Sequence, residues 1–257
     1  HTFEDVFVNK SIRHEEWTPY FLNEFCDDEF IHQYNLSNPD FPLSVARMEQ
    51  IEKMIMHKYD GNKVLADIVS SQLDADRLDY LLRDSHFCGV KYGQFDLRWM
   101  LHCLVPVETE DGFRLGVNYK GVGVVEHYIM ARRLMIRNIY HHYKKHAIEN
   151  LLIKFLEKLS RCLPKESFLK KYKDSKLGQL LISAQKFNKN VGDAGPSEEQ
   201  TQKFLKENFE LYKHLGDGHV LTVISELAFS SKEHDIVTLA KRIYFRQMPE
   251  VYPLDIS

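Results

Sequence analysis

Hydrophobic residues recur along most of this 257-residue chain at the 3.6-residue spacing of an α-helix. Residues 44–59 begin with a capping serine and place Val45, Met48 and Ile55 on one side of a predicted helix. The same criterion predicts further helices at residues 95–104, 201–215, 219–229 and 234–245. The pattern therefore predicts a mainly α fold.

Three segments depart from this simple helical pattern. Residues 103–118 contain two β-prone runs around the sequence TEDG, which predicts one small β hairpin. Residues 123–163 contain no proline, and no glycine beyond their first residue, so they predict one long helix or two helices joined by a kink. Residues 188–200 predict a loop in which Ser197 caps the following helix.

The composition is that of a globular protein, because 44% of the residues are hydrophobic and 28% are charged. The net charge of −3 does not indicate a nucleic-acid or membrane-surface partner, and the basic runs at residues 140–146 and 170–176 are interpreted first as solvated faces. No apolar run approaches the ~20 residues of a membrane span. The four cysteines are far apart, which disfavours a zinc site or disulfide framework and favours a reducing compartment. We therefore expect a cytoplasmic protein.

The segment SSQLDADRLDYLLRDS, residues 70–85, carries four aspartates and no glutamate, although aspartate is the poorer helix former. On a helical wheel, three leucines cover one side, and two aspartates, an arginine and a tyrosine share the other. A surface helix with an Asp79–Arg83 ion pair is the ordinary interpretation. The alternative is a site: short carboxylates hold a divalent cation, arginine binds phosphate, and tyrosine adds a flat wall and a donor. Such a combination indicates a nucleotide.

Extended to residue 97, this segment resembles the one that carries the last metal ligand in HD-superfamily deoxynucleoside triphosphate triphosphohydrolases. Similar stretches are HTFEDVF and RHEEWT near the start, VVEHYIMARRLMIRNIYHH, and AKRIYFRQM. The resemblance implies a mainly α HD-domain fold with one hairpin and a C-terminal helical extension. It also implies metal-dependent hydrolysis of dNTPs to deoxynucleoside and inorganic triphosphate. We expect an HD-type catalytic region at 1–187 without its N-terminal part, a loop at 188–200, and a helical subregion at 201–257 packed on the same domain.

Four residues of the acidic helix acquire roles from this resemblance. Asp76 matches the aspartate that completes the family's metal site, which holds a divalent ion such as Mg²⁺ or Mn²⁺. Arg77 occupies the place of a basic residue that touches substrate phosphate. Tyr80 and Asp84 match residues that line the deoxyribose, where packing would leave no room for a 2′-hydroxyl group.

The long helical segment supplies two further matches. Arg132 matches another phosphate contact, and Tyr140 matches another wall of the sugar site. Without the resemblance, Tyr140 would be interpreted as a core residue.

Histidines near the start of the chain provide the expected proton chemistry. His1 matches the histidine that ends the family's HGPFSH-type run, and His14 matches a second active-site histidine. The resemblance makes both of them proton donors or stabilisers near the scissile bond. Glu4 lies three residues after His1, where a helical turn would let its carboxylate orient an imidazole.

The family's first three metal ligands, a histidine and a His-Asp pair, have no counterpart in this sequence. The His234–Asp235 pair lies at a predicted helix start and is interpreted as a cap. We expect the missing ligands in a segment that precedes His1. The alternative is an inactive HD module that binds nucleotide or single-stranded nucleic acid as a regulator. A third alternative, hydrolysis of another phosphoester, is disfavoured by Tyr80 and Asp84.

The resemblance also implies assembly as a homotetramer with activating nucleotides bound between subunits. Lys120 and Arg246 fall where basic contacts to such activators lie, although surface ion pairs are an equal alternative. Asn118 stands where the larger SAM-plus-HD relative has an arginine, so the identity of the activator stays open.

Overall fold

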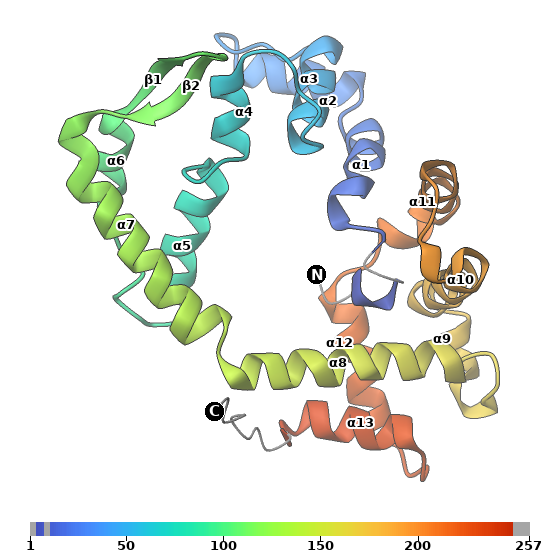
Figure 1. Cartoon of the computed structure of the whole chain (residues 1–257). Coiled ribbons are helices and arrows are strands. Elements are labelled where there is room, and N and C mark those ends of the chain that lie inside the picture. The colour runs from blue at the N-terminus through green and yellow to red at the C-terminus, as the bar shows by residue number, and fades with distance from the viewer. Residues whose placement is uncertain (1–3, 8–10, 249–257) are drawn as a thin grey trace. The chain divides into compact units, whose positions relative to one another are not determined.

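The structure is a computed structural model that describes residues 4–7 and 11–248. Across this described part, the chain is mainly α-helical and contains one two-stranded antiparallel hairpin, which confirms the predicted fold class (Figure 1). The elements form two compact units, one drawn from residues 26–142 and the other from residues 1–25 and 143–257. Among the described helices, each is too short or too polar to cross a membrane.

The unit of residues 26–142 contains the hairpin and most of the predicted site. Its elements are α2 (Asp28–Ser37), α3 (Val45–Ile55), α4 (Lys63–Val69), α5 (Ala75–Phe87), α6 (Leu97–Cys103), β1 (Leu104–Thr109), β2 (Gly112–Val117), the 3-10 turn η4 (Tyr119–Gly121), α7 (Val122–Met135) and the π-turn η5 (Ile136–Tyr140).

The predicted hairpin begins and ends close to its expected positions. Leu104 of β1 lies opposite Val117 of β2, and Thr109 lies opposite Gly112 at the turn. Gly112 adopts φ 101°, a left-handed conformation that glycine adopts without steric cost. The hairpin is attached to α4, because the buried carboxylate of Asp67 accepts two hydrogen bonds from Arg114 and one from a backbone N–H of β2.

Helices α5 and α7 pack against each other to form the core of this unit (Figure 1). The leucine side of α5 is buried as predicted, with Leu78 and Leu81 almost completely covered and Leu82 partly covered. These leucines pack against the buried side of α7, which consists of Val124, Tyr128, Ala131 and Met135. This packing leaves the aspartate side of α5 outside the core.

The predicted helix at residues 44–59 is shorter than expected, and no residue on its apolar side is buried. Ser44 caps α3 as predicted, since its hydroxyl oxygen accepts a hydrogen bond from the N–H of Arg47. However, no residue of α3 is buried, and Val45 is 59% exposed. The sequence spacing predicted the helix correctly but not what would cover it.

The segment at 123–163 forms two helices, which confirms the second of the two alternatives. Helix α7 ends at Met135 and passes into η5, where the N–H of His141 donates to the carbonyl of Ile136 five residues earlier. This wider turn is a π-type hydrogen bond, and single π-turns in helices frequently occur at functional sites. The chain becomes helical again at Tyr143.

The second unit is a helical assembly built around one large apolar core. Its elements are η1 (Glu4–Val6), η3 (His14–Trp17), α1 (Thr18–Phe25), α8 (Tyr143–Cys162), η6 (Ser167–Leu169), α9 (Lys170–Lys173), α10 (Lys176–Val191), η7 (Gly192–Ala194), α11 (Glu198–Tyr212), α12 (Asp217–Ala228) and α13 (Asp235–Tyr244).

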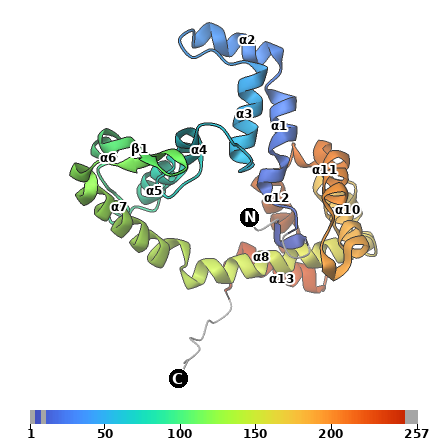
Figure 2. The same cartoon turned by 45° about the horizontal axis from the view of Figure 1, so that its top comes forward.

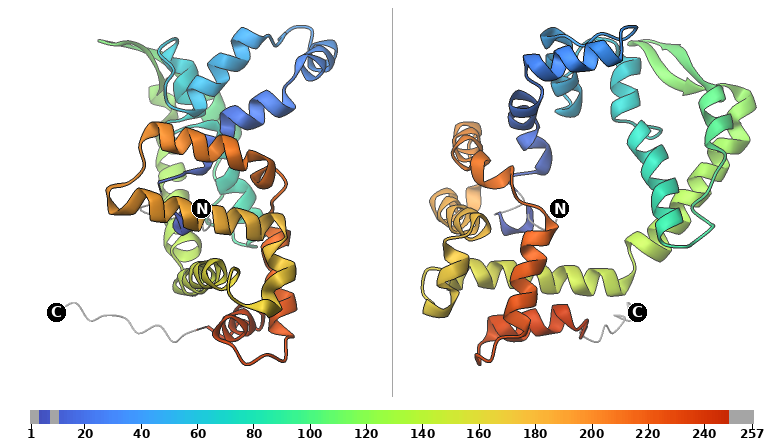
Figure 3. Two further views of the ribbon diagram at one scale, coloured as in Figure 1. Left: turned by 90° about the vertical axis from the view of Figure 1, so that its right-hand side faces the viewer. Right: turned by 180° about the vertical axis from the view of Figure 1, so that it is seen from behind.

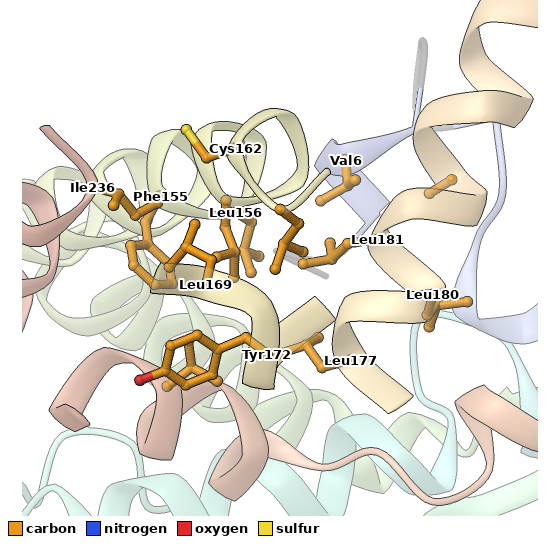
Figure 4. Close-up of a cluster of buried hydrophobic side chains, with 14 of the residues drawn as sticks. Val6, Phe155, Leu156, Cys162, Leu169, Tyr172, Leu177, Leu180, Leu181 and Ile236 are labelled. Atoms are coloured by element: carbon orange, nitrogen blue, oxygen red, sulfur yellow. The ribbon is translucent and has the colours of Figure 1, made fainter. Parts of the chain in front are cut away.

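Within this unit, α10 and α11 lie side by side, as Figure 2 shows and Figure 3 confirms from two other directions. Phe155 and Leu156 of α8 form the centre of the core with Leu181 of α10 and Ile236 of α13 (Figure 4). All four side chains are at most 2% exposed.

Local capping signals in this unit follow the sequence prediction. Ser197 and Gln200 form a capping box at the start of α11. His234 is a helix cap, because its Nδ1 accepts a hydrogen bond from the N–H of Ile236. The predicted loop at 188–200 is shorter than expected, since α10 continues to Val191.

The compact units divide the chain at other positions than the predicted regions 1–187, 188–200 and 201–257. Helices α8 and α10 come before residue 188, yet they share one core with α11, α12 and α13 because their apolar stripes pack together. Residues 26–142 form their own core instead.

Candidate functional site

The turn before α5 is fixed by a buried carboxylate. Asp74 is only 5% exposed and caps the helix, because its Oδ1 accepts a hydrogen bond of 2.8 Å from the N–H of Arg77. Its Oδ2 accepts a second bond, 3.1 Å long, from the N–H of Ser71. These two bonds fix residues 71–74 to the start of the helix and set the direction in which α5 leaves the turn.

Asp76 lies in the first turn of α5 and is exposed. Its carboxylate forms no hydrogen bond or ion pair with a described residue, whereas Asp79 on the same helix is paired with Arg83 through bonds of 2.6 and 3.0 Å. The ordinary interpretation of this helix predicted the ion pair between Asp79 and Arg83, and the pair forms. It explains the presence of Asp79 but not that of Asp76. Asp76 remains an available acidic ligand near the positive end of the helix dipole.

A divalent metal ion needs more ligands than Asp76 provides. Within residues 4–7 and 11–248, no three histidine, cysteine, aspartate or glutamate side chains gather in a way that could hold a metal ion. An exposed, unpaired carboxylate fits the role of one ligand among several, and the remaining ligands would have to come from outside these residues.

The two predicted phosphate-binding arginines are both held by the turn before α5. One guanidinium nitrogen of Arg77 donates to the carbonyl of Ser71 and lies 3.6 Å from Oδ2 of Asp74. Arg132 on α7 donates from Nη1 to the side-chain oxygen of Gln72, 3.1 Å away. The structure therefore brings these arginines, which are 55 positions apart in the sequence, to consecutive residues of one turn.

Tyr128 on α7 contacts the same turn as Arg132. Its hydroxyl group donates to the backbone carbonyl of Gln72 over 3.0 Å. Burial raises the pKa of Tyr128, and the positive charges of Arg132 and Arg77 oppose this shift.

The residues predicted to line a sugar are also brought together. The hydroxyl group of Tyr140 donates to Oδ2 of Asp84 across 2.8 Å. The ring of Tyr80 lies edge-on to that of Tyr140, with ring centroids 6.0 Å apart. Burial, followed by the hydrogen bond and the charge of Asp84, raises the pKa of Tyr140 well above its usual range. Tyr140 is therefore neither a simple core residue nor a free surface residue.

In the other unit, Glu4 and His14 form a carboxylate–imidazole pair. Oε1 of Glu4 lies 2.6 Å from Nδ1 of His14 and also accepts a 3.3 Å bond from the His14 backbone N–H. Burial opposes the shift, but these two bonds lower the pKa of Glu4 below its usual range. The prediction gave Glu4 the task of orienting His1, which lies outside the described residues. The imidazole that Glu4 is seen to orient is that of His14.

The two predicted activator contacts belong to different units. Lys120 is exposed in η4, where its backbone N–H is held by the side chain of Asn118. Arg246 follows α13 with φ 54° and lines a surface cavity of about 610 Å³ with Leu221 and Tyr244. Neither Lys120 nor Arg246 forms an ion pair with a described residue, so the part of the chain that the structure describes does not support the alternative of surface ion pairs.

Comparisons with known proteins give relatives for part of the chain. No protein-family model matches it. The uncharacterized protein YwfO of Bacillus subtilis is 34% identical over 158 residues, which cover 62% of this chain and 33% of that protein. The uncharacterized protein MJ1154 of Methanocaldococcus jannaschii is 39% identical over 75 residues, which cover 29% of this chain and 17% of that protein. The chain thus spans a third or less of the length of these curated relatives.

The crystal structure of a phosphohydrolase (BT4208) from Bacteroides thetaiotaomicron matches 86% of this chain and 48% of its own, with a TM-score of 0.58. Sequence identity between the two is 22%. They share a fold. This chain covers about half of that structure's length. At this level of sequence identity, the similarity concerns the fold alone.

Sequence reasoning missed two residues that shape the site. Gln72 has no distinguishing sequence signal, because its importance comes from a contact with a residue 60 positions away. Tyr128 occupies one of the apolar positions of its helix, and it is buried. Its spacing of four residues from Arg132 is the only signal that could have indicated its place in the site.

Proposed function

We propose that the protein hydrolyses deoxynucleoside triphosphates to a deoxynucleoside and inorganic triphosphate with the help of a divalent metal ion such as Mg²⁺ or Mn²⁺. The observation that supports this best is the convergence on α5. This helix carries Asp76 and Arg77, and the Tyr140–Asp84 hydrogen bond attaches the π-turn to its C-terminal half. A possible ligand for a metal, a cation for phosphate and an aromatic wall for a sugar thus share one helix.

Asp76 would be one of the metal ligands, with the others supplied from outside the described residues. When bound, the ion would polarise the α-phosphate and lower the pKa of the attacking water. Arg77 and Arg132 would bind the phosphate oxygens and stabilise the negative charge that shifts in the transition state.

The sugar would lie against Tyr80 and Tyr140. In this proposal, the hydroxyl hydrogen of Tyr140 is already donated to Asp84, so Tyr140 cannot donate a hydrogen bond to an additional 2′-hydroxyl group. A ribonucleotide would have to fit its 2′-hydroxyl group against the two tyrosine side chains without that donor, which costs free energy and favours the deoxy substrate.

The Glu4–His14 pair would provide the proton for the leaving 5′-oxygen. Glu4 holds the His14 ring through Nδ1, and in this scheme the imidazole of His14 would carry the proton to substrate. In this scheme Glu4 orients His14, and His1 would assist. The structural neighbour is named a phosphohydrolase, which agrees with hydrolysis of a phosphate ester in general.

The experiment is a product analysis with the full-length protein, each of the four dNTPs, and Mg²⁺ or Mn²⁺. We expect chromatography to detect free deoxynucleoside and inorganic triphosphate. Release of dNDP or dNMP would contradict the cleavage position. Binding without turnover, in a preparation free of metal by elemental analysis, would favour the inactive regulatory module instead.

A homotetramer with activating nucleotides bound at Lys120 and Arg246 is the corresponding proposal for regulation. Their exposure and lack of ion-pair partners among the described residues support it. The test is hydrolysis of one dNTP with and without a second, in parallel with light scattering. Unmixed hyperbolic kinetics from a monomer would contradict this proposal.

A further inference from the structure

We infer that Gln72 is a positioning residue that holds Arg132 in the orientation required to bind phosphate. This inference rests on the proposed function, because Gln72 would hold Arg132 in the orientation that the proposed triphosphate site requires. It extends that proposal to a residue of the turn before α5.

Gln72 has two separate anchoring points. Its backbone carbonyl accepts a hydrogen bond from the hydroxyl group of Tyr128, which fixes the main chain. Its side-chain oxygen accepts from Nη1 of Arg132. Tyr128 and Arg132 are one helical turn apart on α7, so one residue of the turn before α5 is tied to two positions on the facing helix.

Arg132 is incompletely satisfied by these contacts. Its Nε is shielded from solvent and has no hydrogen-bond partner among the described residues. A buried guanidinium donor without an acceptor is unfavourable, and in a native protein such a group needs an explanation, of which a catalytic role is one. Gln72 accepts from Nη1 and so orients the plane of the Arg132 guanidinium group.

The same turn holds Arg77 through the carbonyl of Ser71. Asp74 in turn holds the backbone of Ser71, and it is almost fully buried. Both arginines therefore depend on one rigid turn, which would keep two guanidinium groups at a fixed separation. A fixed pair of cations suits a ligand with adjacent phosphate groups better than a monophosphate.

The acceptor on Arg132 is a neutral amide and not a carboxylate. A carboxylate would neutralise part of the Arg132 charge and repel the phosphates of the ligand. An amide oxygen orients the guanidinium group without reducing its net charge. This difference separates positioning from simple charge pairing and can be tested with two variants.

The first variant, Gln72→Met, keeps the length of the side chain but removes the acceptor. Inorganic triphosphate is the probe, measured by calorimetry with the full-length protein, and dNTP hydrolysis is measured in parallel. We expect about tenfold weaker triphosphate binding and a similar rise in KM, with little change in stability, because the backbone bond to Tyr128 remains. Gln94→Met, at an exposed position of the same unit, is the control.

The second variant, Gln72→Glu, keeps an acceptor for Arg132 but adds a negative charge. We expect the Nε–Hε NMR signal of Arg132, assigned with Arg132→Lys, to move in Gln72→Met and to stay ordered in Gln72→Glu. Triphosphate binding should weaken in both. Wild-type affinity in Gln72→Glu would contradict the role given to the neutral amide.

A double-mutant cycle tests whether Gln72 acts through Arg132. In an Arg132→Met background, Gln72→Met should have no further effect on triphosphate binding. Additive losses, or an Arg132 signal that does not change in Gln72→Met, would overturn the inference. If the wild-type protein fails to hydrolyse dNTPs while Gln72→Met still alters the Arg132 signal, the proposed function fails and the positioning role stands.

Discussion

Tyr140 donates a hydrogen bond from its hydroxyl group to Oδ2 of Asp84 over 2.8 Å, joining the π-turn after α7 to the last turns of α5. Both side chains are partly buried. Tyr140→Phe removes the donor and leaves the Asp84 carboxylate less satisfied. We expect the free energy of unfolding to fall by about 1–2 kcal/mol in urea titrations at neutral pH. Tyr119→Phe, at a residue that is 89% exposed, should change it little.

The same hydrogen bond should make stability depend on pH in the alkaline range. Burial and the Asp84 contact raise the pKa of Tyr140 above its ordinary value of 10.0. The folded protein therefore keeps a proton that the unfolded chain releases, so the stabilisation is complete below about pH 10 and is lost as the pH rises further. The stability difference between the wild type and Tyr140→Phe should shrink as the pH rises above about 10. A constant difference would contradict this cause.

The ion pair between Asp67 and Arg114 should stabilise the attachment of the hairpin to α4. Asp67 is buried, while the side chain of Arg114 is 48% exposed, so solvent screens the pair in part. Asp67→Asn should lower the free energy of unfolding by about 1–3 kcal/mol. Asp111→Asn, in the exposed hairpin turn, is the matched control.

The same ion pair should make the free energy of unfolding depend on pH in the acid range. The hydrogen bonds from Arg114, opposed by burial, lower the pKa of Asp67 below 3.8. As the pH falls, the unfolded chain binds the proton first, so the stabilisation is present above about pH 4 and is lost as the pH falls through the lower folded-state value. Urea titrations of the wild type and Asp67→Asn should therefore converge at acid pH. Parallel curves would indicate that the charge of Asp67 is not the cause.

Asp76 should affect activity and stability very differently. Its carboxylate is exposed and unpaired among the described residues, so Asp76→Asn should change the free energy of unfolding by less than about 1 kcal/mol. The proposed hydrolysis should fall at least about 100-fold, because a metal ligand is lost. Asp79→Asn breaks the Asp79–Arg83 pair and should leave hydrolysis near the wild-type rate. Equal activity in both variants would contradict the role of Asp76.

Features encoded by a few neighbouring residues could be predicted from the sequence. Ser197 and His234 cap their helices as expected because a cap requires contact only with the next three residues. The hairpin turn at Gly112 was predicted for the same reason, and a kink within residues 123–163 was one of the two alternatives. Each depends on local backbone geometry.

Contacts between distant residues could be predicted only in part. The resemblance put Tyr140 and Asp84 in one site, but their hydrogen bond joins residues 56 positions apart and depends on the π-turn. The pairing of Glu4 with His14 depends on how η1 and η3 pack. Helix α3 is an example of a missing prediction. Its periodicity predicted an apolar side, but the sequence did not indicate what would cover that side, and no residue of α3 is buried.

Two glycines in helices should respond in opposite ways to alanine. At Gly178 in α10, a Cβ atom would lie 1.9 Å from the carbonyl oxygen of Tyr172, and backbone atoms there cannot move aside easily. Gly178→Ala should therefore destabilise the protein by about 1–3 kcal/mol. At Gly123 in α7, a Cβ atom would meet nothing within 4 Å. Gly123→Ala should be neutral or stabilising by up to about 1 kcal/mol, because alanine favours the helix. Thermal and urea unfolding of both variants measure the difference, and an unchanged Gly178→Ala protein would show that α9 and α10 can separate without cost.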